Sequence, residues 1–330
     1  MAIRVIQFSH PGLQLDVEPG RRNERYSFYE NDDKCGLRTW NYDSGHFRKF
    51  LRADGYYMKS MDESPTKGEL LFWGEWEPYS EFKHLRVGKN VQEPEAIHAP
   101  IRYNEKDMEK FDVNTDPFMW SKLYYSTCKQ RTFSFLRDLE EGSVLVLGTE
   151  YGEEFAIDTI YVVGSEQYFM KDLLADPDVQ LVDWYVDQSY SRIDKSYTAE
   201  YADPDTRDSR LRALDEIKTY EGRAHRSSDP TKKYLFSYTP AKLYSEHPMG
   251  FERMKVKSVD WGFQNPGAGT VTWRVKDETG ERIETFDGAK KFWESITEEC
   301  LRQGFYLGTR LMSNIPKLST LPTERLFQWD

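Results

Sequence analysis

The chain has 330 residues, of which 38% are hydrophobic and 31% are charged. Aromatic residues reach 15%, and because rings bury a large apolar area per residue, this composition excludes a disordered chain. The formal net charge of -11 at pH 7 argues against broad, sequence-independent binding to duplex DNA, which needs many Lys and Arg contacts to phosphates. A local basic patch, or binding of a single nucleotide or base, stays compatible with that charge.

The first part of the chain alternates β signals with polar connections. Residues 3–8 predict a strand that ends at a Pro-Gly turn, and residues 13–40 predict a loop. Residues 46–54 carry apolar side chains at helical spacing before a glycine, which predicts a short helix. Residues 69–73 predict a strand, and residues 85–117 predict a long ordered excursion or a lid.

The strongest β signal lies in the middle of the chain. Residues 143–147 and 155–163 are rich in β-branched residues and close in sequence, so they predict an antiparallel hairpin. A short helix is expected over residues 167–174. Residues 202–217 predict a further helix whose alternating charges favour a solvated face.

The last third predicts two strands and one clear helix. The strands are expected at residues 234–238 and around residues 271–275. The helix is expected from a cap at Asp287 to Arg302, with Gly304 as its stop. One apolar stripe of this helix should be buried, and its members are Ala289, Trp293, Ile296 and Cys300.

These elements predict an α+β fold, with a mixed or antiparallel, barrel-like sheet and flanking helices. We expect an aromatic-rich β-core domain over residues 1–174 and a polar connecting segment over residues 175–232. Residues 233–330 form an α+β C-terminal part, either separate or in the same composite domain. No fixed-period repeat is present.

Targeting signals and cysteine usage indicate a soluble cytoplasmic protein. Residues 1–8 favour a strand over a signal peptide, and no window approaches the roughly 18 apolar residues of a membrane span. Cys35, Cys128 and Cys300 are widely spaced, which fits free thiols in a reducing compartment. The six histidines show no ligand spacing, so neither a metal nor a cofactor is expected.

The segment from Gly68 to Ser80 is the most informative motif. It places Trp73, Trp76, Glu75 and Glu77 at the end of a short apolar strand. Aromatic faces beside carboxylates suit a planar, hydrogen-bonding or cationic guest. They equally suit a strand end that anchors its own core.

Three further residues are candidates for chemistry. His10, at the end of the first strand, is a candidate acid–base residue, with a satisfied turn histidine as the alternative. Lys49, on the expected basic helix, suits a phosphate or carboxylate, with a solvated face as the alternative. Asp158 interrupts an apolar strand and must be paired or face the polar side of the sheet. Strand alternation places it with Ala156 and Ile160, either inside a pocket or toward solvent.

A turn and a following polar stretch supply the remaining candidates. Asn114 and Asp116 belong to a turn built by Asn, Asp and Pro. Lys129 could meet an anion and Gln130 could contact an amide or base edge. Cys128 lacks a base at recognisable spacing, which favours a buried structural thiol over a nucleophile.

The hairpin segments, Gly142-Ser-Val-Leu-Val-Leu-Gly and Phe155-Ala-Ile-Asp-Thr-Ile-Tyr-Val-Val, resemble the central strands of small PUA-like barrels. This superfamily includes the ASCH, EVE and YTH domains, and the resemblance covers residues 69–165, with Ser143 where an acid is usual. It implies a pocket that holds a base or modified base. Trp73 and Trp76 would form an aromatic cage, and Lys129 or Gln130 would read the base edge. The chain otherwise looks like a prokaryotic family tied to nucleic-acid modification or defence.

Three functions follow from these features. The first is binding of a nucleobase, nucleotide or modified nucleic acid by stacking, which contributes roughly 1–3 kcal/mol per base. The second is a nucleotide-acting transferase or hydrolase in which His10, Lys49, Glu75 and Asp158 converge on one cleft. The third is an interaction subunit whose aromatic excess forms a protein interface.

Overall fold

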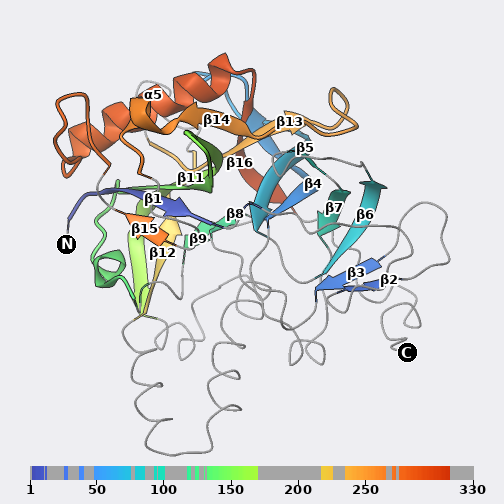
Figure 1. The fold of residues 1–330 in the computed structure, drawn as a ribbon, viewed down its shortest axis with the longest axis horizontal. Coiled ribbons are helices and arrows are strands. Elements are labelled where there is room, and N and C mark those ends of the chain that lie inside the picture. Colours follow the sequence, from blue (N-terminus) through green and yellow to red (C-terminus); the bar gives the residue numbers. More distant parts are fainter. Residues whose placement is uncertain are drawn as a thin grey trace, which may run out of the picture.

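The computed structural model describes about half of the chain in detail. The described residues are 2–10, 12, 26–28, 37–40, 48–75, 79–85, 93–94, 96–100, 117–119, 123–125, 130, 132–169, 217–225, 235–264, 270–272 and 275–312. They form a mixed α+β structure with two mostly antiparallel sheets and one α-helix (Figure 1). The α+β class expected from the sequence is therefore confirmed at this level.

The first sheet contains the central hairpin. Its strands, in spatial order, are β15 (Thr270–Thr272), β1 (Val5–Ser9), β10 (Val144–Tyr151), β11 (Glu154–Phe169), β12 (Lys218–Gly222), β9 (Leu123–Tyr125) and β8 (Phe118–Met119), with β14 (Met254–Lys257) also paired to β11. Only the β1–β10 pair of this sheet is parallel among the described strands. The expected opening strand and the antiparallel β10–β11 hairpin are confirmed.

The second sheet contains the tryptophan motif. Its strands, in spatial order, are β16 (Tyr306–Met312), β13 (Thr239–Leu243), β5 (Thr66–Glu75), β4 (Arg48–Met58), β7 (Ala96–Pro100), β6 (Tyr79–Leu85), β3 (Leu37–Trp40) and β2 (Tyr26–Phe28). Strand β16 also pairs with β4, so β4, β5, β13 and β16 form a cycle of pairings. The remaining strands leave the sheet open at its β2 end, and the sheet as a whole is not a clear barrel.

The two sheets meet at the middle of β11. Ile160 and Tyr238 exchange backbone hydrogen bonds of 2.9 and 2.8 Å, and Tyr238 directly precedes β13 of the second sheet. The C-terminal part of the chain contributes β14 and β15 to the first sheet and β13 and β16 to the second. Strands from residues 1–174 and 233–330 are thus paired in both sheets.

Helix α5 (Phe286–Arg302) lies along β13, β14 and β16 (Figure 1). Its first turn is capped by Thr285, whose hydroxyl accepts a hydrogen bond from the Gly288 N–H at 3.2 Å, so the cap is two residues before the expected Asp287. Gly304 ends the helix region with φ +77°, a conformation that favours glycine. The expected stripe of Ala289, Trp293, Ile296 and Cys300 is buried, which confirms Cys300 as a core residue.

The predicted helix over residues 46–54 is wrong, because the described part of this segment starts the long strand β4. Phe50 and Leu51 belong to different core clusters, so this half of the strand is buried on both faces. Such a strand shows no polar alternation, and its apolar spacing fits a helix equally well. Gly55 lies inside the strand, where a Cβ would come within 2.8 Å of the Arg310 carbonyl oxygen of neighbouring β16.

Several other boundaries differ from the sequence analysis. The loop expected over residues 13–40 contains β2 and β3, and the excursion over residues 85–117 contains β7. Gln167, Tyr168 and Phe169 extend β11 and do not start a helix, while residues 170–174 lie outside the described residues. These misses involve short strands of three to five residues and one strand end, where local patterns are weakest.

The last two predicted strands are shifted. The strand expected at residues 234–238 begins only at Thr239, and the one around residues 271–275 covers residues 270–272. Of the helix expected over residues 202–217, only Ile217 is described. No helix of the described part is both long and apolar enough to cross a membrane.

Candidate ionic site between the two sheets

The candidate site begins with an irregularity in the central hairpin. Leu147 pairs with Thr159 and Gly148 pairs with Ile157, so Asp158 is an extra residue on β11, in a β-bulge. The bulge shifts the alternation of the strand, because Ile157 and Ile160 belong to the same core cluster. The expectation that Ile160 shares a face with Ala156 and Asp158 is therefore wrong.

Gly148 makes the bulge sterically possible. A Cβ at this position would lie 2.1 Å from the Ala156 carbonyl oxygen, far inside van der Waals contact. The Gly148 carbonyl oxygen also accepts a hydrogen bond of 2.8 Å from the His10 N–H. The bulge thus lies directly beside the end of β1.

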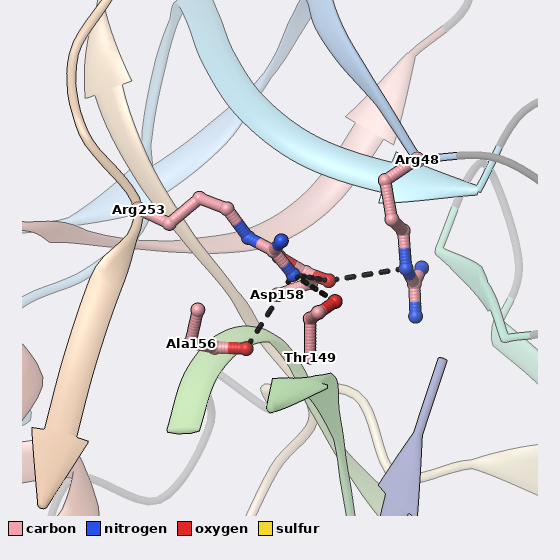
Figure 2. Close-up of polar contacts among 5 residues, drawn as sticks. All are labelled: Arg48, Thr149, Ala156, Asp158 and Arg253. Atoms are coloured by element: carbon pink, nitrogen blue, oxygen red, sulfur yellow. Dashed lines mark hydrogen bonds and ion pairs between the residues drawn. The ribbon is translucent and has the colours of Figure 1, made fainter. Parts of the chain in front are cut away.

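Asp158 is held by two arginines from different elements (Figure 2). Arg253, which precedes β14, donates from Nε to Oδ1 at 2.8 Å and from Nη2 to Oδ2 at 2.6 Å. The same Nη2 donates to the Thr149 hydroxyl at 2.8 Å. Arg48, the first residue of β4, places Nε 3.1 Å from Asp158 Oδ2. A carboxylate in an apolar strand is thus paired, as burial of a charge requires.

The site carries an excess of buried positive charge. The side chains of Arg48, Asp158 and Arg253 are each at most 1% exposed, and guanidinium groups stay protonated in proteins. Burial lowers the pKa of Arg253 below its ordinary value, while Asp158 raises this pKa and Arg48 lowers it. Two cations therefore share one anion among the described residues of this site.

Several nitrogen donors of the site are buried without a hydrogen-bond acceptor among the described residues. They are Arg48 Nε, Arg48 Nη2, Arg253 Nη1 and Trp73 Nε1. Arg48 Nε is close enough to Asp158 for an ion pair but is not aligned for a hydrogen bond. All four groups donate only and cannot accept.

Trp73 lies in the core at 2% exposure, not on an open surface. Its ring contacts Phe50 edge-on at a centroid distance of 5.3 Å. The Arg253 guanidinium carbon lies 5.3 Å from the Trp73 ring centroid, a cation–π distance. Trp73 therefore supports Arg253 and does not offer a free stacking face.

Backbone contacts connect His10 and Glu75 to the elements that carry Asp158 and Arg48, and Lys49 is the residue after Arg48. His10 is bonded to Gly148 beside the bulge of Asp158, and Glu75 is the cross-strand partner of Arg48. Lys49 is buried and follows Arg48, so strand alternation places it on the opposite face of β4. The His10 ring stacks on Phe8 at 5.3 Å. The Lys49 side chain therefore lies on the face of β4 opposite to the Arg48 side chain that contacts Asp158.

Gln130 has a structural role in the described part of the chain. Its amide donates to the Lys218 carbonyl oxygen at 2.6 Å and accepts from the Lys218 N–H at 2.9 Å. Both ends of the amide are therefore occupied by the backbone of β12. The remaining candidates, Trp76, Glu77, Asn114, Asp116 and Lys129, lie outside the described residues.

Sequence reasoning missed Arg48, Arg253 and Thr149. Arg253 lies 95 residues from Asp158 in the chain, and no local pattern marks it. The available signal was indirect: a carboxylate in an apolar strand needs a buried cation, which makes an arginine beside apolar residues a candidate partner.

Comparison of the chain with protein-family models, curated proteins and solved structures found no match. The PUA-like resemblance therefore stays a prediction. The segment that carries it contributes β5 to the second sheet and the β10–β11 hairpin to the first. Within the described residues, no group of three or more His, Cys, Asp or Glu side chains is arranged to hold a metal ion.

Proposed function

We propose that this protein binds a nucleotide, or another anionic ligand that carries a nucleobase, at the junction of its two sheets. The observation that supports this proposal is the Arg48–Asp158–Arg253 cluster, a buried site with more positive than negative charge. Arginine is well suited to phosphate and carboxylate groups because its planar fork donates two parallel hydrogen bonds. A single charged site also fits a chain whose net charge of -11 opposes polyanionic partners.

The aromatic part of the proposal concerns the residues around this cluster. Trp73 of β5 contacts Arg253 of the cluster, and Phe50 of β4 packs against Trp73. Trp76 directly follows β5 in the chain. Because the Trp73 ring is buried in the core, it is not available to a ligand. Trp76 is therefore the indole that we assign to base stacking. The barrel-like, PUA-related architecture is part of this proposal, and its support is the sequence resemblance over residues 69–165.

Titration calorimetry against nucleosides, nucleotides and short modified oligonucleotides tests the proposal. We expect saturable binding by the wild-type protein and clearly weaker binding by Trp76→Ala, with a nearly unchanged melting temperature. Loss of a stacked base should weaken affinity by roughly 1–3 kcal/mol. Tyr151→Ala is the matched control, because Tyr151 is an exposed aromatic residue on β10. A large drop in melting temperature for Trp76→Ala would assign that indole to the core instead.

A nucleotide-acting transferase or hydrolase is the second candidate. Its support is the position of His10, whose backbone is bonded to Gly148 at the bulge that carries Asp158. His10 is the candidate acid–base group, since both Asp158 oxygens accept hydrogen bonds from Arg253. Turnover of a nucleotide by wild type, followed by chromatography and lost in His10→Asn with retained binding, would favour this reading over simple binding.

A further inference from the structure

We infer that Arg48 and Arg253 form a preorganised oxyanion-binding site, and that the oxyanion is the phosphate of the proposed nucleotide. The identification with a nucleotide rests on the proposed function. The oxyanion site itself rests only on the geometry around Asp158.

The first argument is the chemistry of the unmatched groups. Arg48 Nε and Nη2, Arg253 Nη1 and Trp73 Nε1 are buried and lack hydrogen-bond acceptors among the described residues. Each is a donor only, so a cation or a donor ligand cannot satisfy any of them. A phosphate or carboxylate presents several acceptor oxygens and a negative charge in one compact group.

The second argument is charge. Asp158 neutralises one guanidinium, and Arg253 uses both of its oxygens in a bidentate pair. Arg48 is left with an ion pair at 3.1 Å and no hydrogen bond. An uncompensated buried charge is strongly unfavourable, and a bound anion would balance it.

The third argument is rigidity. Arg253 is fixed by Asp158, by the Thr149 hydroxyl and by the face of Trp73. Asp158 is fixed by the bulge that Gly148 permits. Figure 2 shows the Asp158 carboxylate between the two guanidinium groups, with Arg48 reaching it from the start of β4. Asp158 is thus a positioning residue, and Arg48 is the group left to bind a ligand.

Arg52, on the same strand, is an arginine whose Nε has a hydrogen-bond acceptor. Its Nε donates to Glu69 Oε1 at 2.6 Å, and its guanidinium carbon lies 3.4 Å from the Tyr244 ring centroid. One carboxylate matches one guanidinium there, at a partly exposed position. Arg52 is therefore the matched control for Arg48.

The test combines thermal shift and calorimetry with inorganic phosphate, acetate, adenosine and adenosine monophosphate as probes, at constant ionic strength. A ligand that binds only the native state raises the melting temperature. We expect phosphate to raise the wild-type melting temperature more than the same ionic strength of chloride does. Arg48→Met should lose this shift and bind adenosine monophosphate about tenfold or more weakly, as loss of a charged hydrogen bond predicts. Its affinity for adenosine should not change, and Arg52→Met should behave as wild type.

The outcomes separate the inference from the proposed function. Equal binding of adenosine and adenosine monophosphate, with no response to phosphate or acetate, would overturn the oxyanion site and leave only the nucleobase-binding part of the proposed function standing. A phosphate or acetate response that Arg48→Met abolishes, without binding of either adenine compound, would support the oxyanion site and count against a nucleotide of this kind. A stronger response to acetate than to phosphate would overturn the assignment to phosphate. If Arg48→Met fails to fold, Arg48→Lys serves instead, because it keeps the charge and loses the fork.

Discussion

At the scale of single residues, Asp158 organises the junction between the sheets. Its carboxylate binds Arg253 in a bidentate pair and also contacts Arg48, with all three side chains buried. Removing one partner of such a buried pair leaves a charge without compensation, and that costs more than the pair contributes. The stability of the site should therefore depend on Asp158 far more than on any exposed acid.

Asp158→Asn should lower the free energy of unfolding by about 3–5 kcal/mol, because two buried guanidinium groups would lose their counter-charge. Chemical denaturation measures this change. Glu69→Gln is the control, since it breaks the partly exposed pair with Arg52, and pairs in contact with solvent contribute about 0–1 kcal/mol. Equal effects of the two substitutions would contradict the role assigned to Asp158.

At the scale of elements, the β10–β11 hairpin and β4 determine where the site forms. The bulge re-aims β11 at Asp158, and the absence of a side chain at Gly148 permits the close approach of the Ala156 carbonyl there. Strand β4 delivers Arg48 from the opposite sheet. The hairpin and β4 are buried on both faces in this region. The position of the charged side chains therefore depends on the strand backbones, and a small backbone displacement would separate Arg48 from Asp158.

Gly148→Ala should destabilise the protein by about 1–3 kcal/mol, as overpacking typically does. The new Cβ would lie 2.1 Å from a backbone oxygen, which cannot move as a side chain could. Gly74→Ala on β5 is the control, because its nearest neighbour would be 3.6 Å away, an ordinary contact. Thermal and chemical denaturation of both variants measure the loss of stability. A loss no larger for Gly148→Ala than for Gly74→Ala would show that the bulge tolerates a side chain.

At the scale of the whole molecule, each sheet combines strands from the N-terminal and C-terminal parts of the chain. Strands β13 and β16 complete the second sheet, whereas β14 and β15 pair with β11 and β1 of the first. The ionic cluster and the Ile160–Tyr238 hydrogen bonds also connect the sheets. Neither sheet can therefore lose its C-terminal strands without exposing core residues.

Unfolding of the described core should be one cooperative transition. We expect far-UV circular dichroism and tryptophan fluorescence to give the same denaturation midpoint, since Trp73 belongs to the second sheet and Trp293 to the helix beside it. Asp158→Asn should shift both curves together. Two separate midpoints in wild type would instead indicate that the sheets unfold independently.

Local signals in the sequence were sufficient for β1, for the β10–β11 hairpin and for α5. Strong apolar runs, β-branched residues and a glycine after the helix are short-range features that need no knowledge of the fold. They failed for β4, because a strand buried on both faces has the same apolar spacing as a short helix. The convergence of His10, Lys49, Glu75 and Asp158 on one cleft stays a prediction; the structure adds that Lys49 and the Asp158-binding Arg48 are adjacent on β4, so strand alternation places their side chains on opposite faces.

The sequence by itself determined the α+β class, the buried helix stripe and the choice at Asp158 between a paired carboxylate and a solvent-facing one, since each follows from spacing or from the cost of burying a charge. Only the tertiary structure decided that the partners are Arg253 and Arg48. The physical reason is that strand pairing brings together residues far apart in the chain, and the bulge at Asp158 changes which side chains face one another.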